Sequence, residues 1–258
     1  AASLWAASAP AETNDTDGRL TELERIAERI YEAAKSGDAE YCRELLEEYT
    51  AQMVKIAYDG MTGAEGLNAL TQTLVQAKET FNKVRFSRQE GMTAAVKLRL
   101  ATDALSPRSE PMWLEYRKVL KRDADELKEA ASARDPEAAR KALAALRGHY
   151  GIIRPSALID REPAAVAKAD SLLAFLGKEV GLSSPNFERI GQGASHLDEV
   201  LDGLFGAGDA ETGGPVWSRR QPAAWTGVMA AVIVTVLAYA GWRIYAAEKR
   251  LSLRRPRD

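Results

Sequence analysis

One stretch of the sequence, Ala223–Trp242, runs for 20 residues without a charged side chain. A helix needs about 20 apolar residues to cross a hydrocarbon core of roughly 30 Å. Trp225 stands near the start of the stretch and Tyr239 near its end, where aromatic rings favour the headgroup level of a bilayer. A buried core helix is the alternative, but the polar linker before the stretch and the basic residues after it argue against one. The sequence therefore predicts one C-terminal transmembrane helix.

The residues after this predicted span, 243–258, carry six Lys or Arg side chains and two acidic ones. Because basic flanks favour the cytoplasmic side, we expect a basic cytoplasmic tail and a single-pass protein of the cell membrane with most of its chain extracytoplasmic. The formal net charge is −2 for the chain and +4 for this tail, which leaves −6 for residues 1–242. An acidic outer domain is a poor match for nucleic acid, so we expect no nucleic-acid partner.

The segments that flank the outer domain are small or polar. Residues 1–11 have the character of a signal-peptide remnant, since Ala9-Pro10-Ala11 has the small-x-small pattern of a cleavage site. Residues 12–18 are polar and are predicted to form a disordered leader. Residues 206–222 are rich in Gly and predict a flexible tether, whose length of roughly 20–25 Å would hold the domain near the membrane surface.

Residues 19–205 show the apolar spacing of amphipathic helices and none of the alternation typical of strands. The sequence therefore predicts an all-α domain, a bundle of antiparallel helix pairs. Capping residues mark two helix starts, one after Ser36-Gly37-Asp38 and one at Asp135-Pro136. Pro155 and Pro163 bracket residues 156–162, which we expect to form an extended loop. The expected helices cover 20–34, 41–56, 67–84, 87–105, a segment that begins near 111, 136–150, 166–180 and 184–204.

A weak internal repeat relates Ala33–Tyr49 to Ala130–Leu146, at an offset of 97 residues. Both segments contain two alanines, a break, an acidic cap, a Glu two residues later, and then Arg and Leu on a new helix. Duplication would produce this pattern, and so would convergence, because helical hairpins share such capping sequences. Both interpretations predict antiparallel helix pairs.

The residue types that carry most enzyme chemistry are scarce, with two histidines and one cysteine in the chain. Neither histidine has the H-E-x-x-H spacing of a zinc site. Ser195, His196 and Asp198 are too close together on one helix to share a face, so they cannot form a catalytic relay. Cys42 occupies an apolar position of an expected helix, which favours a buried thiol over a reactive one. We therefore expect no enzyme, and no catalytic, metal-binding or cofactor-binding site.

Three places stand out as candidate interaction or structural positions. Arg99 and Asp103 are four residues apart within the apolar sequence LRLATDAL, which fits either a routine ion pair or a buried polar anchor between helices. Trp113 is the only tryptophan of residues 19–205, and core filling is favoured there over a contact with a partner. Tyr150 and Pro155 bound the sequence YGIIRP, which predicts a structural corner.

Small residues recur every four positions within the predicted span, among them Gly227 and Ala231. Such residues permit the close approach of two helices in a membrane, which suits a homodimer through the span. Ala and Gly are common in any span, so a monomeric anchor is equally compatible with this pattern.

Four motifs resemble those of one protein family: KLRLATDALSPRSEPMW (97–113), HYGIIRPSALID (149–160), KADSLLAFL (168–176) and YAGWRIY (239–245). The chain resembles the YpjB family of sporulation proteins from endospore-forming bacteria over most of its length. This resemblance implies a setting in endospore formation and carries over no catalytic signature. The candidate positions that fall in the matching motifs are Arg99, Asp103, Trp113, Tyr150, Pro155 and Asp160.

Two functional hypotheses follow. In the first, the chain is a non-enzymatic, membrane-anchored sporulation protein whose outer helical domain is a scaffold for an unidentified protein partner. In the second, it is a ligand-binding or sensory module with a pocket between helix pairs, to which Arg99 with Asp103, or Tyr150, would contribute polar contacts. A concave apolar pocket lined by these residues would favour the module. Buried side chains that satisfy one another would favour the scaffold.

Overall fold

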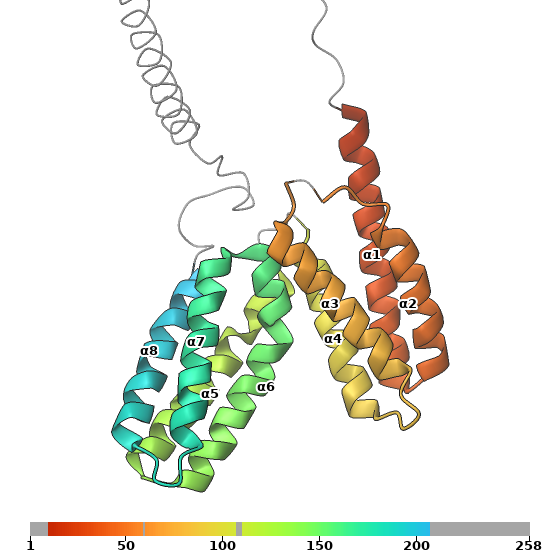
Figure 1. The fold of residues 1–258 in the computed structure, drawn as a ribbon. Helices are drawn as coiled ribbons and strands as arrows, with labels where there is room; N and C mark the ends of the chain where they lie inside the picture. Colours follow the sequence, from red (N-terminus) through yellow and green to blue (C-terminus); the bar gives the residue numbers. More distant parts are fainter. Residues whose placement is uncertain (1–9, 59, 107–109, 207–258) are drawn as a thin grey trace, which may run out of the picture. The chain divides into compact units, whose positions relative to one another are not determined.

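The computed structural model describes residues 10–206 apart from residue 59 and residues 107–109. This part of the chain contains eight α-helices, one short 3-10 helix and no strand, so the expected all-α class is confirmed (Figure 1). None of these helices is both long enough and apolar enough to cross a membrane. The predicted transmembrane helix Ala223–Trp242 lies outside the described residues, as do residues 1–9, the tether from residue 207 onward and the basic tail.

The helices run alternately up and down along the chain (Figure 1). The first four are α1 (Pro10–Ser36), α2 (Ala39–Met53), α3 (Ala64–Phe81) and α4 (Arg88–Asp103). The 3-10 helix η1 (Met112–Tyr116) leads into the other four, which are α5 (Arg117–Ser132), α6 (Pro136–Asp160), α7 (Pro163–Val180) and α8 (Phe187–Gly206).

The chain builds the same four-helix bundle twice. In α1–α4 the first helix packs against the second and the fourth, and the third packs against the fourth; α5–α8 repeat this pattern helix by helix. The turn after α1 also recurs after α5, where Gly37 (φ 86°) and Arg134 (φ 53°) occupy equivalent positions. Each is followed by an aspartate that caps the next helix, Asp38 or Asp135. The sequence repeat therefore coincides with a structural repeat, which favours duplication over convergence.

The buried positions of the two bundles correspond at fixed offsets. In the first two helices of each bundle the offset is that of the sequence repeat, and in the last two it is two residues longer, as the starts of α3 and α7 show. Corresponding buried pairs are Leu23 and Leu120, Ile30 and Leu127, Leu46 and Leu143, Leu74 and Leu173, Ala95 and Ala194, and Leu98 and Leu197. Each bundle thus buries its own set of apolar side chains, and the two sets join in one continuous core.

The prediction of a disordered leader over residues 12–18 is wrong. The structure begins α1 at Pro10, so these residues are helical. Once the packed part of α1 has nucleated the helix, each further residue adds one backbone hydrogen bond, and the helix extends towards its N-terminus.

The expected corner at Tyr150–Pro155 and the expected loop at 156–162 are also wrong. The structure continues α6 through Pro155 to Asp160. A proline inside a helix costs about 3 kcal/mol, because it removes one hydrogen bond and crowds the preceding turn. Ile153 and Ile159 are both fully buried, and the burial of such side chains on either side of the proline outweighs its cost.

The two bundles are joined through the C-terminal half of α6, which also packs against α3 and α4 of the first bundle. Gly66 on α3 permits this close approach. A Cβ atom there would lie 2.9 Å from both the Ile159 Cα and the Leu158 carbonyl oxygen. Nearby, the Thr62 hydroxyl donates a hydrogen bond to the Ile159 carbonyl oxygen (3.1 Å).

Candidate functional site

Several residues that stand out in the sequence meet where α4, η1, α6 and α8 come together. Asp103 ends α4, Trp113 lies in η1, Asp160 ends α6 and Arg161 follows it, while Phe205 lies in the last turn of α8. We call these five residues the junction cluster. The sequence singled out Asp103, Trp113 and Asp160, but not Arg161 or Phe205.

Trp113 is at the centre of the junction cluster. Its side chain is fully buried, which confirms the prediction of core filling. Its indole Nε1 donates a hydrogen bond to Asp160 Oδ2 (3.1 Å), and its ring centroid lies 5.2 Å from that of Phe205. The guanidinium carbon of Arg161 lies 5.2 Å from the same indole ring. Trp113 therefore contacts the C-terminal ends of both α6 and α8.

The Arg161–Asp160 ion pair of the junction cluster joins a buried arginine to a partly buried carboxylate. Arg161 is only 7% exposed, and its Nη1 pairs with Asp160 Oδ2 at 3.1 Å. Its Nε donates to the carbonyl oxygen of Leu204 (3.0 Å), one of the last carbonyls of α8, which have no donor within the helix. Burial raises the pKa of Asp160, and Arg161 and the Trp113 N–H partly offset that rise. Pairing is what makes such burial tolerable, since an unpaired buried charge costs several kcal/mol.

Asp103 and Arg99 both lie on α4 but anchor different elements. Asp103 accepts a hydrogen bond from the backbone N–H of Met112 (2.7 Å), which ties the end of α4 to the start of η1. Arg99 forms an ion pair with Glu28 of α1, and its guanidinium carbon lies 4.7 Å from the centroid of the Tyr31 ring. These contacts match the hypothesis of polar anchors between elements.

Tyr150 lies in the second bundle, where it fastens α6 to α7. Its hydroxyl donates a hydrogen bond to Asp170 Oδ1 (2.9 Å). Arg154 donates two hydrogen bonds to the same carboxylate, from Nε (2.9 Å) and Nη2 (2.7 Å). Burial raises the pKa of the Tyr150 phenol. Pro155 lies on α6 near this group and is half-buried. Neither residue is placed with the junction cluster.

A buried acid that the sequence did not single out lies on α5. Asp123 is 1% exposed, and its Oδ2 lies 2.5 Å from His149 Nδ1 of α6. The repeat contains a signal for it, because Asp123 is the counterpart of the buried Ile26 in the first bundle. A carboxylate at a core position predicts a partner on a neighbouring helix.

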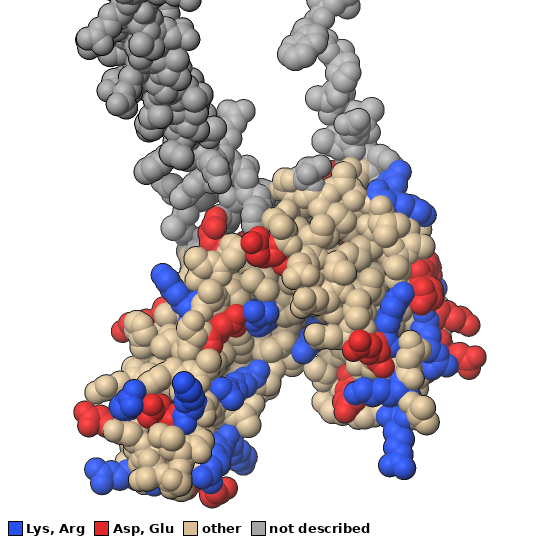
Figure 2. Space-filling model, in the orientation of Figure 1, with Lys and Arg blue, Asp and Glu red and all other residues tan. Residues whose placement is uncertain are grey.

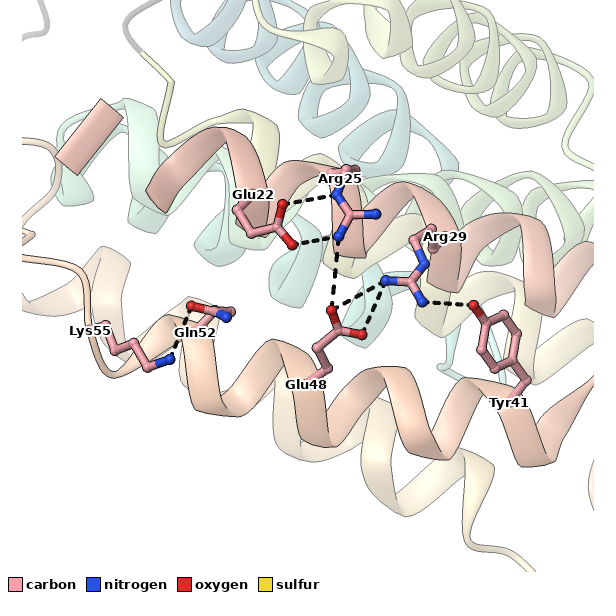
Figure 3. A network of polar contacts seen from close by, with 7 residues as sticks. All are labelled: Glu22, Arg25, Arg29, Tyr41, Glu48, Gln52 and Lys55. Carbon is pink, nitrogen blue, oxygen red and sulfur yellow. Dashed lines mark hydrogen bonds and ion pairs between the residues drawn. The ribbon is translucent and has the colours of Figure 1, made fainter. Parts of the chain in front are cut away.

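A second polar network covers the outer side of α1 and α2 (Figure 3). Arg29 Nη1 lies 3.1 Å from Glu48 Oε2, and Arg29 Nη2 donates to the Tyr41 hydroxyl (2.7 Å). Arg25 pairs with Glu22 on its own helix (2.5 Å) and lies 4.0 Å from Glu48. Exposed pairs contribute about 0–1 kcal/mol each, so this network helps to set the register of the two helices without adding much stability.

A surface cavity of about 370 Å³ adjoins the junction cluster. Its walls are charged, and two of its members are held in ion pairs, Arg99 with Glu28 and Arg25 with Glu22. Arg99 and Asp103 line this cavity, as the hypothesis of a ligand-binding module expects, whereas their contacts with Glu28 and Met112 are those expected of a scaffold. The described residues that line it are Thr21, Glu24, Arg25, Glu28, Arg99, Asp103 and Met112.

Metal and thiol chemistry has little support in the described part of the chain. No group of three or more His, Cys, Asp or Glu side chains there is placed to hold a metal ion. Cys42 is fully buried, as expected, and burial raises the pKa of its thiol to about 11. Little thiolate is therefore present at neutral pH.

These contacts define a class of protein, a duplicated helical unit whose buried polar residues fasten its helices to one another. The chain matches the family described as sporulation protein YpjB (SpoYpjB) over residues 20–254, and it belongs to that family. A relative named "Uncharacterized protein YpjB", from Bacillus subtilis (strain 168), is 25% identical over a match that covers 90% of this chain and 87% of the relative. No solved structure matches the chain.

Proposed function

We propose that this chain is a non-enzymatic, membrane-anchored sporulation protein whose outer helical unit is a scaffold for another protein. The observation that carries the proposal is the burial of Trp113 and Tyr150, whose polar atoms are bonded within the chain to the partly buried Asp160 and to Asp170. A fully buried side chain is not available to a partner or a substrate. These motif residues therefore stabilise the fold, and we expect exposed residues to bind the partner protein.

The surface is uneven in charge. In Figure 2, Lys, Arg, Asp and Glu gather over the outer parts of both bundles, whereas uncharged surface predominates over the N-terminal part of α3 and the neighbouring end of α6. On α3, the residues from Gly66 to Ala77 include no charged side chain. A helical unit with distinct charged and uncharged faces suits protein recognition.

The membrane anchor belongs to the proposal and rests on the sequence of Ala223–Trp242 and the basic residues after it. Because α8 ends at Gly206, residues 207–222 would link the helical unit to the membrane. The homodimer through Gly227 and Ala231 lies outside the described residues and stays a prediction.

Topology is tested with single cysteines in a Cys42→Ala background. Thr71→Cys places a thiol on the exposed side of α3, and Ser252→Cys places one in the basic tail. A membrane-impermeant maleimide added to intact cells should label the first variant, and the second only after the membrane is permeabilised. The reverse pattern would contradict the proposed orientation.

The role in sporulation is tested by deleting the gene in its sporulating host and counting heat-resistant spores. The count should fall, and the full chain should restore it, whereas a chain that lacks residues 223–242 should not. An unchanged count in the deletion strain would contradict the proposal.

The second candidate, a ligand-binding or sensory module, is favoured by the charged cavity of about 370 Å³ beside Asp103 and Arg99. Thermal unfolding in the presence of soluble cell-wall fragments separates the two candidates, because a ligand that binds only the folded state raises Tm. A rise in Tm that Arg99→Ala abolishes would favour the module. An unchanged Tm at millimolar fragment would favour the scaffold.

A further inference from the structure

The duplication provides an internal comparison between two equivalent grooves. In the first bundle, α6 packs against both α3 and α4 and occupies part of the outer groove between them, next to an open part of about 250 Å³ that Ala77 and Ala94 line. Gly66 meets the α6 backbone directly, and Thr73, Leu100 and Ala104 on the walls of this groove are buried. This groove is therefore a docking site for a helix, and it is occupied by a helix of the same chain.

The equivalent groove of the second bundle lies between α7 and α8. The counterparts of Gly66, Thr73, Leu100, Ala101 and Ala104 there are each half-buried or exposed. The same positions of the repeat thus differ in burial, because a helix covers them in one bundle and they remain accessible in the other. These accessible counterparts are Ala165, Leu172, Glu199, Val200 and Gly203.

The α7–α8 groove keeps the shape and part of the chemistry of a helix-docking site. It forms a cavity of about 390 Å³, whose apolar walls include Leu172 and Val200. Small side chains at Ala167 and Ser171 leave room for a backbone to approach. Lys168 stands in the same groove, is exposed, and forms no ion pair with any described residue.

We propose that the α7–α8 groove docks an amphipathic helix of a partner protein in the way that the α3–α4 groove holds α6. The inference rests on the proposed function, since it names the surface through which the helical unit binds its partner. The partner helix carries a seam of small or β-branched residues, since Ile159, whose backbone meets Gly66, and Ser156 three residues before it are both fully buried on α6. It also carries an acidic side chain opposite Lys168, which forms no ion pair with any described residue. Glu199 of the same groove lies 3.3 Å from His196 Nδ1 instead.

The test begins with photocrosslinking in the full, membrane-anchored chain in sporulating cells. A benzophenone amino acid is placed at Ser171 in the groove and, as a control, at Glu40, an exposed position of α2. Ser171 should give an adduct that Glu40 does not, and the crosslinked peptide should come from a helix with the stated seam and acidic residue. An adduct with a second copy of this chain, with a peptide of other character, or no adduct would overturn the proposal.

The second step measures binding of a synthetic peptide with the crosslinked sequence to the purified full chain. Leu172→Glu should weaken binding by about tenfold or more, because it places an unpaired charge against an apolar seam. Val54→Glu is the matched control at an exposed apolar position, 77% exposed at the end of α2, and should leave the affinity unchanged. Equal affinities of the Leu172→Glu variant and the wild type would overturn the proposal.

A charge exchange keeps the test independent of folding. Lys168→Glu lies at an exposed position and should weaken binding of the peptide, and a peptide whose acidic residue is replaced by Lys should recover it. If the Lys-substituted peptide does not recover binding to Lys168→Glu, the proposed contact between Lys168 and an acidic residue of the partner is wrong. If gene deletion lowers the spore count but Leu172→Glu and Lys168→Glu do not, the groove proposal fails while the proposed function stands.

Discussion

At the scale of single residues, we expect Trp113 to make the largest contribution to the free energy of unfolding. Its ring is fully buried among the ends of α6 and α8, and its one polar atom is bonded to Asp160. Burial of an aromatic side chain removes about 150–250 Å² from water and dominates the energetics of its surroundings. Substitutions at Trp113 separate the contribution of this burial from that of the hydrogen bond.

We predict that Trp113→Ala lowers the free energy of unfolding by about 3–5 kcal/mol, through lost burial and the cavity left behind. Trp113→Phe keeps most of the ring but removes the Nε1 donor, and should cost about 1–3 kcal/mol because Asp160 Oδ2 loses one of its two partners and keeps only Arg161. Urea unfolding followed by circular dichroism at 222 nm measures both. Val54→Ala, at an exposed position, is the control, and a cost below about 1 kcal/mol for Trp113→Ala would contradict the prediction.

The buried thiol of Cys42 gives a pH dependence with a definite sign. Burial raises its pKa from 9.0 to about 11, so the folded state holds the thiol proton more tightly than the unfolded state does. The stability that this contributes is fully present below pH 9 and is lost as the pH rises towards about 11.

The free energy of unfolding should therefore fall more steeply between pH 9 and about 11 in the wild type than in Cys42→Ala. Denaturant unfolding at a series of pH values in this range measures the two slopes. Other groups titrate in both proteins, so the difference between the slopes reports Cys42 alone. Equal slopes would show that the thiol proton is no more tightly held in the folded state.

At the scale of elements, α6 is the helix that belongs to both bundles. Its N-terminal half packs against α5 and its C-terminal half against α3 and α4. Two glycines in this region differ in whether a larger side chain would fit. Gly66 on α3 is required by the close approach of α6, whereas a Cβ atom at Gly148 on α6 would meet nothing within 4 Å.

We predict opposite signs for two matched substitutions. Gly66→Ala should lower the free energy of unfolding by about 1–3 kcal/mol, since its Cβ would press on the backbone of Ile159. Gly148→Ala should raise it by about 0.5–1 kcal/mol, because alanine is the better helix former and meets no neighbour. Urea unfolding of both variants checks the signs, and a stabilising Gly66→Ala would show that the two helices do not approach closely.

At the scale of the whole helical unit, the two bundles are coupled through α6 and the junction cluster. Arg161 acts on this coupling indirectly: it holds the end of α6, which also packs against the first bundle, to Asp160 and to the Leu204 carbonyl at the end of α8. Removal of one partner from a buried ion pair costs about 3–5 kcal/mol, since the other charge is left uncompensated.

We predict that the wild-type unit unfolds in one calorimetric transition and that Arg161→Ala separates it into two, one for each bundle. The double substitution Asp160→Asn with Arg161→Met removes both charges and should recover part of the lost stability. Differential scanning calorimetry measures the number of transitions. A single transition shifted to lower temperature in Arg161→Ala would mean that α6 alone couples the bundles.

Local signals in the sequence determined most of the helices. Apolar spacing placed the core positions, and short-range caps placed the helix starts after Asp38 and Asp135, because a cap bonds N–H groups within three residues of itself. The buried thiol of Cys42 followed from the same spacing. The repeat was also visible in sequence, but only the matching helix contacts favoured duplication.

The tertiary structure decided what depends on distant residues. The path of α6 through Pro155 follows from burial against α3 and α4, which no local propensity reveals. The partners of Trp113 lie 47 and 92 positions further along the chain, at Asp160 and Phe205, and Arg99 pairs with Glu28, 71 positions earlier. Local sequence specifies which residues are helical and which side is apolar, whereas contacts between helix ends depend on how the whole chain packs.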